Sequence, residues 1–155
     1  MRFDLARLST ATKILLAGGI LLLIDLFLDW QQVCVNFGPA SACGGRSGWH
    51  GIGVLVGLLT IALIAWELLQ ALEVKIGLPD TVPENLISVA LAAAVALFAI
   101  IEFFTHNEAR HWPAWIGLIL AIVIAVGGFL KFGEAPARTT TPATPPPPTT
   151  PPPAV

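Results

Sequence analysis

The sequence predicts an all-α membrane protein, a four-transmembrane-helix bundle followed by a disordered, Pro/Thr-rich C-terminal tail. Of its 155 residues, 55% are hydrophobic and only 12% are charged, whereas soluble domains carry about 25% charged residues. A soluble domain of this length has too little interior to bury so many apolar side chains. The net charge of −2 comes with scattered Lys and Arg, so no basic patch for nucleic acid is expected.

Four apolar runs have the length of about 20 residues that a helix needs to cross the hydrocarbon core. Backbone groups must be paired within each segment there, which favours helices. Thr81 and Glu84 predict a capping box at the third run, and Pro113 suits the first turn of the fourth. No run alternates with period two, which argues against a barrel. The predicted spans are residues 11–30, 51–72, 83–104 and 113–132.

The first run has some features of a cleaved signal peptide. Basic residues precede it, and Ala40-Ser41-Ala42 before Cys43 is similar to a cleavage site. The polar residues 29–32 separate the apolar core from that site by too great a distance. We therefore expect a retained membrane span.

Basic residues predict the orientation of the spans. If residues 1–10 are cytoplasmic, six of the eight basic residues lie on that side, namely Arg2, Arg7, Lys13, Lys75, Lys131 and Arg138. Only Arg46 and Arg110 lie on the other side. The positive-inside rule then places both termini in the cytoplasm of a multi-pass protein of the cell membrane. Four of the five tryptophans would anchor the outer interface, namely Trp30, Trp49, Trp112 and Trp115.

The C-terminal tail, residues 133–155, differs in composition from the rest of the chain. It holds nine of the thirteen prolines, runs of threonine and, from Ala135 on, the single charge of Arg138. Such a segment cannot form a core and is expected to be extended. It is interpreted as a solvated spacer, with a docking strip for a proline-binding groove or a glycosylated outer stalk as alternatives.

Cys34 and Cys43 both fall in the first outer loop. Two cysteines on the oxidising side, at a spacing that a loop can close, predict one disulfide bond. Free or catalytic thiols remain as alternatives, although a redox enzyme more often shows a C-x-x-C motif.

Acidic residues at membrane depth form the candidate polar site, which comprises Asp25, Asp29 and Glu102. A charge in the membrane is costly unless it is paired, neutralised or hydrated. Asp25 and Asp29 are four residues apart and would share a helix face. Their role is either structural pairing or the handling of ions or protons, with Arg46, Arg110, His50 and His106 as candidate partners. Glu67, near the inner end of its span, is expected to snorkel to the interface.

The same region offers a weak pattern for a metal site. Glu102 and His106 have i, i+4 spacing, and Asp25 or Asp29 would add oxygen ligands. No H-x-x-x-H or H-E-x-x-H signature is present. We therefore expect neither a metal nor any other cofactor, and a polar, pH-responsive outer cap instead.

Small residues predict close helix packing. Gly53 and Gly57 form a G-x-x-x-G pair, and a stripe along the fourth span comprises Gly117, Ala121, Ala125 and Gly128. Such stripes let helix backbones approach closely in lipid, either within one chain or between chains.

Several short motifs resemble uncharacterised short four-span bacterial membrane proteins of an actinobacterial type. The similarity covers residues from about 8 to 132, and Asp29 stands where that group usually has proline. The resemblance implies a fold and no activity. The matching pieces are Leu26-Phe27-Leu28, Ser47-Gly48-Trp49, Ala114-Trp115-Ile116-Gly117 and Gly127-Gly128-Phe129.

The sequence therefore favours a non-enzymatic integral membrane protein that acts as an accessory or interaction subunit. Its expected partners are the lipid bilayer and either a second copy or another membrane protein. The alternative is a small oligomeric channel or transporter that uses the acidic residues. A membrane enzyme built on His50 or His106 ranks third.

Overall fold

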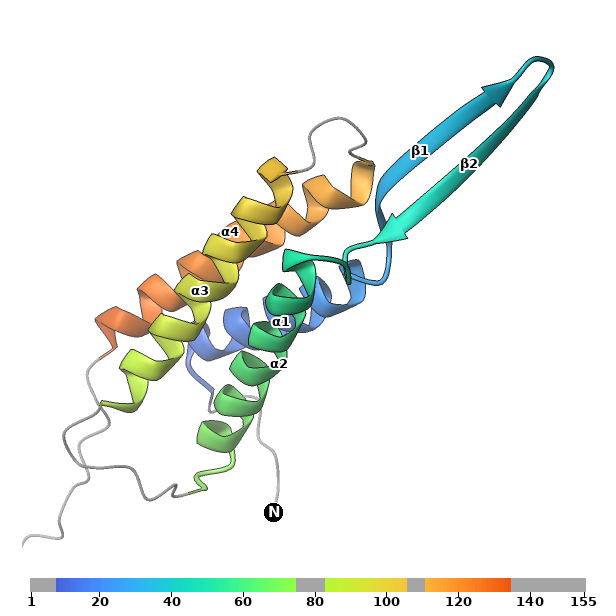
Figure 1. Ribbon diagram of the computed structural model, residues 1–155. Helices are drawn as coiled ribbons and strands as arrows, with labels where there is room; N and C mark the ends of the chain where they lie inside the picture. Colours follow the sequence, from blue (N-terminus) through green and yellow to red (C-terminus); the bar gives the residue numbers. More distant parts are fainter. Residues whose placement is uncertain (1–7, 75–82, 106–110, 135–155) are drawn as a thin grey trace, which may run out of the picture.

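The computed structural model describes residues 8–74, 83–105 and 111–134. It contains four helices and one hairpin, which extends from one end of the helices (Figure 1). We call the end of the helices that carries the hairpin the hairpin end, and the opposite end the polar end. The elements in chain order are α1 (Thr10–Asp25), β1 (Asp29–Phe37), β2 (Ala40–Ser47), α2 (Ile52–Ala71), α3 (Glu84–Thr105) and α4 (Trp112–Gly133).

Three of the helices are long and apolar enough to cross a membrane, namely α2, α3 and α4. They have 20, 22 and 22 residues, which corresponds to about 30–33 Å at 1.5 Å per residue. The hydrocarbon core is about 30 Å thick. Each of these helices agrees with its predicted span to within one residue at either end.

The prediction of four membrane-length helices is wrong in its count. Helix α1 starts after Ser9, whose side chain accepts a hydrogen bond from the Thr12 backbone N–H, and it ends at Asp25 after only 16 residues. Apolar residues continue beyond Asp25, which is why the predicted span reached residue 30. There the chain makes a tight turn, in which Leu28 N–H donates to the Asp25 carbonyl, and enters β1.

The helices pack as a ring of neighbours. Helix α1 contacts α2 and α4, and α3 contacts the same two helices. Consequently α2 and α4 face each other across the middle. The core between the helices is apolar and includes Leu15, Leu22, Val56, Leu63, Val95, Ala121 and Ile124.

Many large apolar side chains point outward from this core. Helices α2, α3 and α4 each expose several, among them Leu58, Ile61, Leu97, Ile119 and Ile122. A soluble protein rarely exposes continuous apolar surface on this scale. Lipid is the solvent that suits it, so the outer surface agrees with helices that lie in a membrane.

The small residues of the predicted packing set lie in different surroundings. Gly128 closely approaches Ala92 of α3, where an added Cβ would lie 2.8 Å from the Ala92 Cβ. Gly53 lies against the Gly48 carbonyl and Gly57 against the Trp49 ring, so both pack on the connection before α2 rather than on another helix.

The two alanines of that set differ from each other. Ala121 is fully buried. Ala125, four residues later on α4, is exposed. The buried face of α4 therefore continues through Ile124 and Gly128 instead.

The hairpin corrects the prediction of an all-α fold. Strands β1 and β2 form an antiparallel two-stranded sheet, with Gly38 at a φ of 63° in the turn. Cys34 faces Cys43 across the sheet, with 4.0 Å between their Cα atoms, and the predicted disulfide joins them. The alternation of Val33, Val35 and Phe37 with Cys34 and Asn36 is the strand signal in this segment.

Candidate functional site

At the hairpin end, Asp25 and Trp30 form a buried pair. The Trp30 Nε1–H donates to Asp25 Oδ2 at 3.0 Å and lies 3.1 Å from the Asp25 carbonyl oxygen. Both residues are only 3% exposed. The indole ring covers Gly117 of α4, where any Cβ would overlap it. The last residue of α1 is thus fixed to the first residues of the hairpin.

A second contact joins the hairpin to α4. The His111 backbone N–H donates to the Trp30 carbonyl oxygen at 2.8 Å, immediately before α4 begins. Trp30 therefore connects the end of α1, the base of β1 and the start of α4. This arrangement holds the base of the hairpin in a defined position on the helices.

The other predicted members of the polar site are Asp29 and Glu102. Asp29 does not share a helix face with Asp25, because α1 has ended; it is exposed in β1, opposite Ser47, and its carboxylate lies over Gly45. Glu102 is buried on α3.

The predicted cationic partners do not surround Asp25 in the part of the chain that is described. Arg46 is exposed on β2 and faces Gln31. The His50 ring is exposed, with its Nδ1 3.2 Å from the Ser47 carbonyl oxygen. Arg110 and His106 lie outside the described residues. Among the described residues, the Asp25 carboxylate accepts its hydrogen bond from the neutral indole of Trp30.

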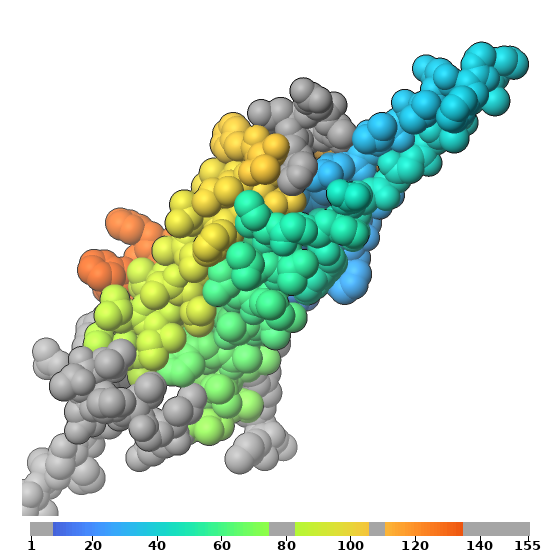
Figure 2. Space-filling model, in the orientation of Figure 1, coloured from blue at the N-terminus to red at the C-terminus, as the bar shows by residue number. Residues whose placement is uncertain are grey.

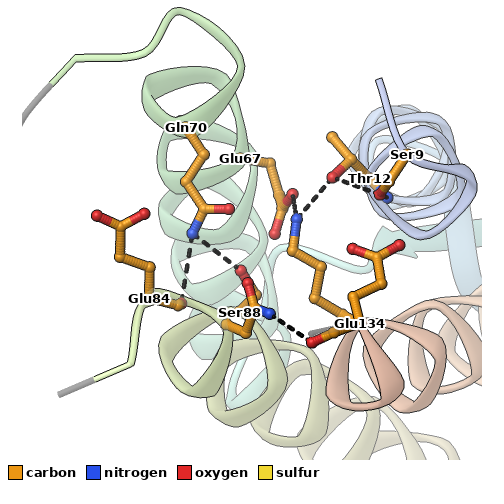
Figure 3. A network of polar contacts seen from close by, with 9 residues as sticks. Ser9, Thr12, Glu67, Gln70, Glu84, Ser88 and Glu134 are labelled. Carbon is orange, nitrogen blue, oxygen red and sulfur yellow. Dashed lines mark hydrogen bonds and ion pairs between the residues drawn. The ribbon is translucent and has the colours of Figure 1, made fainter. Parts of the chain in front are cut away.

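At the polar end, a buried ion pair joins α2 and α4 (Figure 3). Lys131 Nζ lies 3.1 Å from Glu67 Oε2 and also donates to Thr12 Oγ1 at 2.6 Å. The Thr12 hydroxyl in turn accepts from Ser9 Oγ at 3.2 Å. The Glu67 side chain is fully buried and that of Lys131 is 6% exposed. One lysine thus connects α1, α2 and α4.

Further hydrogen bonds attach α3 to this end. Gln70 Nε2 of α2 donates to the Glu84 carbonyl at 3.3 Å and to Ser88 Oγ at 3.4 Å. Asn85 Nδ2 donates to the Glu134 carbonyl, which follows α4, at 3.0 Å. Figure 3 shows the two groups of contacts side by side between the helix ends. All four helices are therefore joined by polar side chains at one end.

Sequence reasoning missed the ion pair of Lys131 and Glu67, as it missed the hairpin. The expectation that Glu67 snorkels to the interface is wrong, because its side chain is fully buried. A signal was present: both residues lie near the ends of spans that finish on the same side. Opposite charges at matching depth on two helices of one bundle predict a pair.

The geometry supports structural roles for these polar groups. The Glu67 and Lys131 charges neutralise each other, and Asp25 holds Trp30. Across residues 8–74, 83–105 and 111–134, no cluster of three or more His, Cys, Asp or Glu side chains is suited to a metal. Comparison of the chain with family models, curated proteins and solved structures finds no match.

Proposed function

We propose that the protein is a multi-pass cell-membrane protein that works without catalysis, as an accessory or interaction subunit. The single observation that supports this is the hairpin. It extends from the helices (Figure 1), is fixed at its base by Trp30 and exposes Val33, Val35 and Phe37. An apolar, exposed element of this kind is suited to contact with another protein.

The disulfide supports an outward position for the hairpin. Disulfides persist in oxidising compartments outside the cytoplasm. With Cys34 and Cys43 outside, the polar end faces the cytoplasm. Helix α1 starts and α4 finishes at that end, so we propose that both chain termini are cytoplasmic, in line with the excess of basic residues on that side.

The test compares the full chain with a variant that changes only the hairpin surface. Val35→Ser and Phe37→Ser together remove the apolar side chains, while Gln32→Ser and Asn36→Ser provide a control on the other face of β1. Complexes are isolated from native membranes under mild detergent. We expect the first variant to lose the assemblies that the parent and the control retain. Equal recovery by all three proteins would refute the hairpin as the contact element.

A small oligomeric channel or transporter is the second candidate. One observation favours it: Asp25 Oδ1 is buried without a hydrogen-bond partner in the described part of the chain. Such an acid at membrane depth is a candidate for ion or proton handling. Flux through liposomes that contain the parent, and loss of that flux in Asp25→Asn without loss of stability, would favour this function over the first.

A further inference from the structure

The two faces of the hairpin differ in chemistry. Val33, Val35 and Phe37 lie on one face and are 56%, 49% and 68% exposed. Their cross-strand neighbours on that face are the small residues Gly44, Ala42 and Ala40. We call this set of six residues the apolar face. The other face carries the disulfide together with Gln32, Asn36 and Ser41.

The hairpin lacks the features that usually keep exposed strands apart. Natural edge strands are protected by charged side chains, by proline or by a covering element. No charged residue occurs between Asp29 and Arg46, and Pro39 stands only in the turn. Figure 2 shows the hairpin standing clear of the helices in this view. A two-stranded sheet of this kind is marginally stable alone and gains from a partner.

Most of the apolar face lies too far from the membrane that holds the helices to contact its lipids. Helices and hairpin extend in a common direction (Figure 1). Phe37 is eight residues beyond Asp29, the first residue of β1, which at about 3.3 Å per residue places it roughly 26 Å beyond the base. Trp30 fixes that base through Asp25 and His111, which opposes folding of the strands back onto lipid. The occupant of the apolar face is therefore a protein.

A second copy of the chain fits this face. Copies in one membrane share their orientation, so a two-fold axis along the membrane normal brings identical faces together. The six residues of the apolar face carry no charge, so they cover their own copy without burying an unpaired charge. Gln31 and the exposed Arg46 lie opposite each other at the base of the same face, outside these six residues. Confinement to a membrane also raises the effective concentration for a patch of modest area.

We propose that the apolar face binds the same face of a second copy, which gives a parallel, two-fold symmetric dimer outside the membrane. This inference rests on the proposed function, of which it names the partner. Two sheets that pack in this way lie about 10 Å apart, with their side chains interleaved. The small residues of β2 leave room for the larger side chains of the partner's β1.

The test is photocrosslinking of the full chain in liposomes at several protein-to-lipid ratios. p-Benzoylphenylalanine replaces Val35 or Phe37 in two proteins, and Gln32 or Asn36 in two controls from the opposite face of the same strand. We expect a covalent dimer from positions 35 and 37 that persists as the protein is diluted in lipid, and none from 32 and 36. Dimer from both faces alike, or only monomer and lipid adducts, would overturn the proposal.

A charge variant provides a second readout. Val35→Lys with Phe37→Lys places two charges on the apolar face, and we expect the dissociation constant in the membrane to rise by at least about tenfold. Gln32→Lys with Asn36→Lys is the matched control and should leave it unchanged. If every variant is monomeric while the serine variant at 35 and 37 still loses its native assemblies, the dimer is wrong and the interaction function stands. If the dimer forms through the apolar face but the serine variant loses no other protein from its assemblies, the interaction function stands only as self-association.

Discussion

A lysine amine inside a membrane protein is costly unless its charge is balanced, and Lys131 meets this condition with Glu67 and Thr12. The pair joins α2 to α4 across the middle of the helices, and the hydroxyl adds α1. Removal of one partner leaves the other charge buried and alone, whereas replacement of both leaves only a packing change.

We therefore expect single changes at this pair to be much more harmful than the double change. Glu67→Leu or Lys131→Met should lower the free energy of unfolding by about 3–5 kcal/mol, and the two together by far less. Thermal unfolding in detergent, followed by helical circular dichroism, measures all three. Glu84→Gln is the control, since this side chain is exposed at the same end and should change little. Additive losses in the double variant would show that the pair contributes no coupling.

Gly117 provides a residue-scale test of the Trp30 contact. An added Cβ would overlap the indole ring, so Gly117→Ala should displace Trp30 and cost about 1–3 kcal/mol. Gly133→Ala, in the same helix, meets open space and should be neutral. The thermal midpoints and the tryptophan emission spectra of the two variants check this. Equal behaviour of both variants would mean that the indole does not rest on α4.

Loss of the disulfide is expected to destabilise the hairpin and to have little effect on the stability of the helices. Two strands alone are marginal in water, and a closed loop of this size is worth on the order of 2–3 kcal/mol. In a Cys34→Ser, Cys43→Ser variant, amide hydrogen exchange should become faster over residues 31–46 while the helices keep their protection. Faster exchange throughout α1 and α4 as well would show that the hairpin supports the helical part.

The sequence predicted the three long apolar helices and the disulfide. The bounds of α2, α3 and α4 follow from long apolar runs, and the disulfide follows from two cysteines in one outer loop. The end of α1 could not be predicted in this way, because Leu26, Phe27 and Leu28 are as apolar as the helix before them. What ends α1 is a turn in which Trp30 returns to Asp25, and that contact is tertiary.

The hairpin and the ion pair escaped prediction for related reasons. The alternation of apolar and polar residues in β1 covers only residues 33–37, since Gln31 and Gln32 precede it. It is therefore a much weaker signal than the four long apolar runs. Hydropathy also treats each charged residue separately, so Glu67 and Lys131 each lower the hydropathy of a span near its end. Their pairing depends on which helices meet, and the ring order of the helices is not encoded in any single segment.

At the scale of the whole molecule, the short helix α1 decides the topology. Its 16 residues extend about 24 Å, less than the hydrocarbon thickness of about 30 Å. Thr12, near its start, nevertheless contacts Lys131 in the last turn of α4, and Asp25 lies beside Trp30 at the hairpin end. Helix α1 therefore extends over nearly the same length of the bundle as its neighbours, and bilayers adapt to a difference of this size by local thinning.

We accordingly predict that α1 crosses the membrane and that both termini are cytoplasmic. Reporters that are active only inside the cell should give signal at the N-terminus and at the C-terminus, and a reporter that is active only outside should give signal when inserted between Gly38 and Pro39 of the hairpin turn. The N-terminal fusion is the decisive one, because if α1 failed to cross the membrane, the N-terminus would lie outside while the C-terminus stayed inside.

Lys13→Gln is the control for the charge in the first turn of α1. The orientation should be unchanged in this variant, since five further basic residues are expected on the cytoplasmic side. Outside activity at the N-terminus alone would leave three crossings, and outside activity at both termini would place the disulfide hairpin in the cytoplasm, where such a bond does not persist.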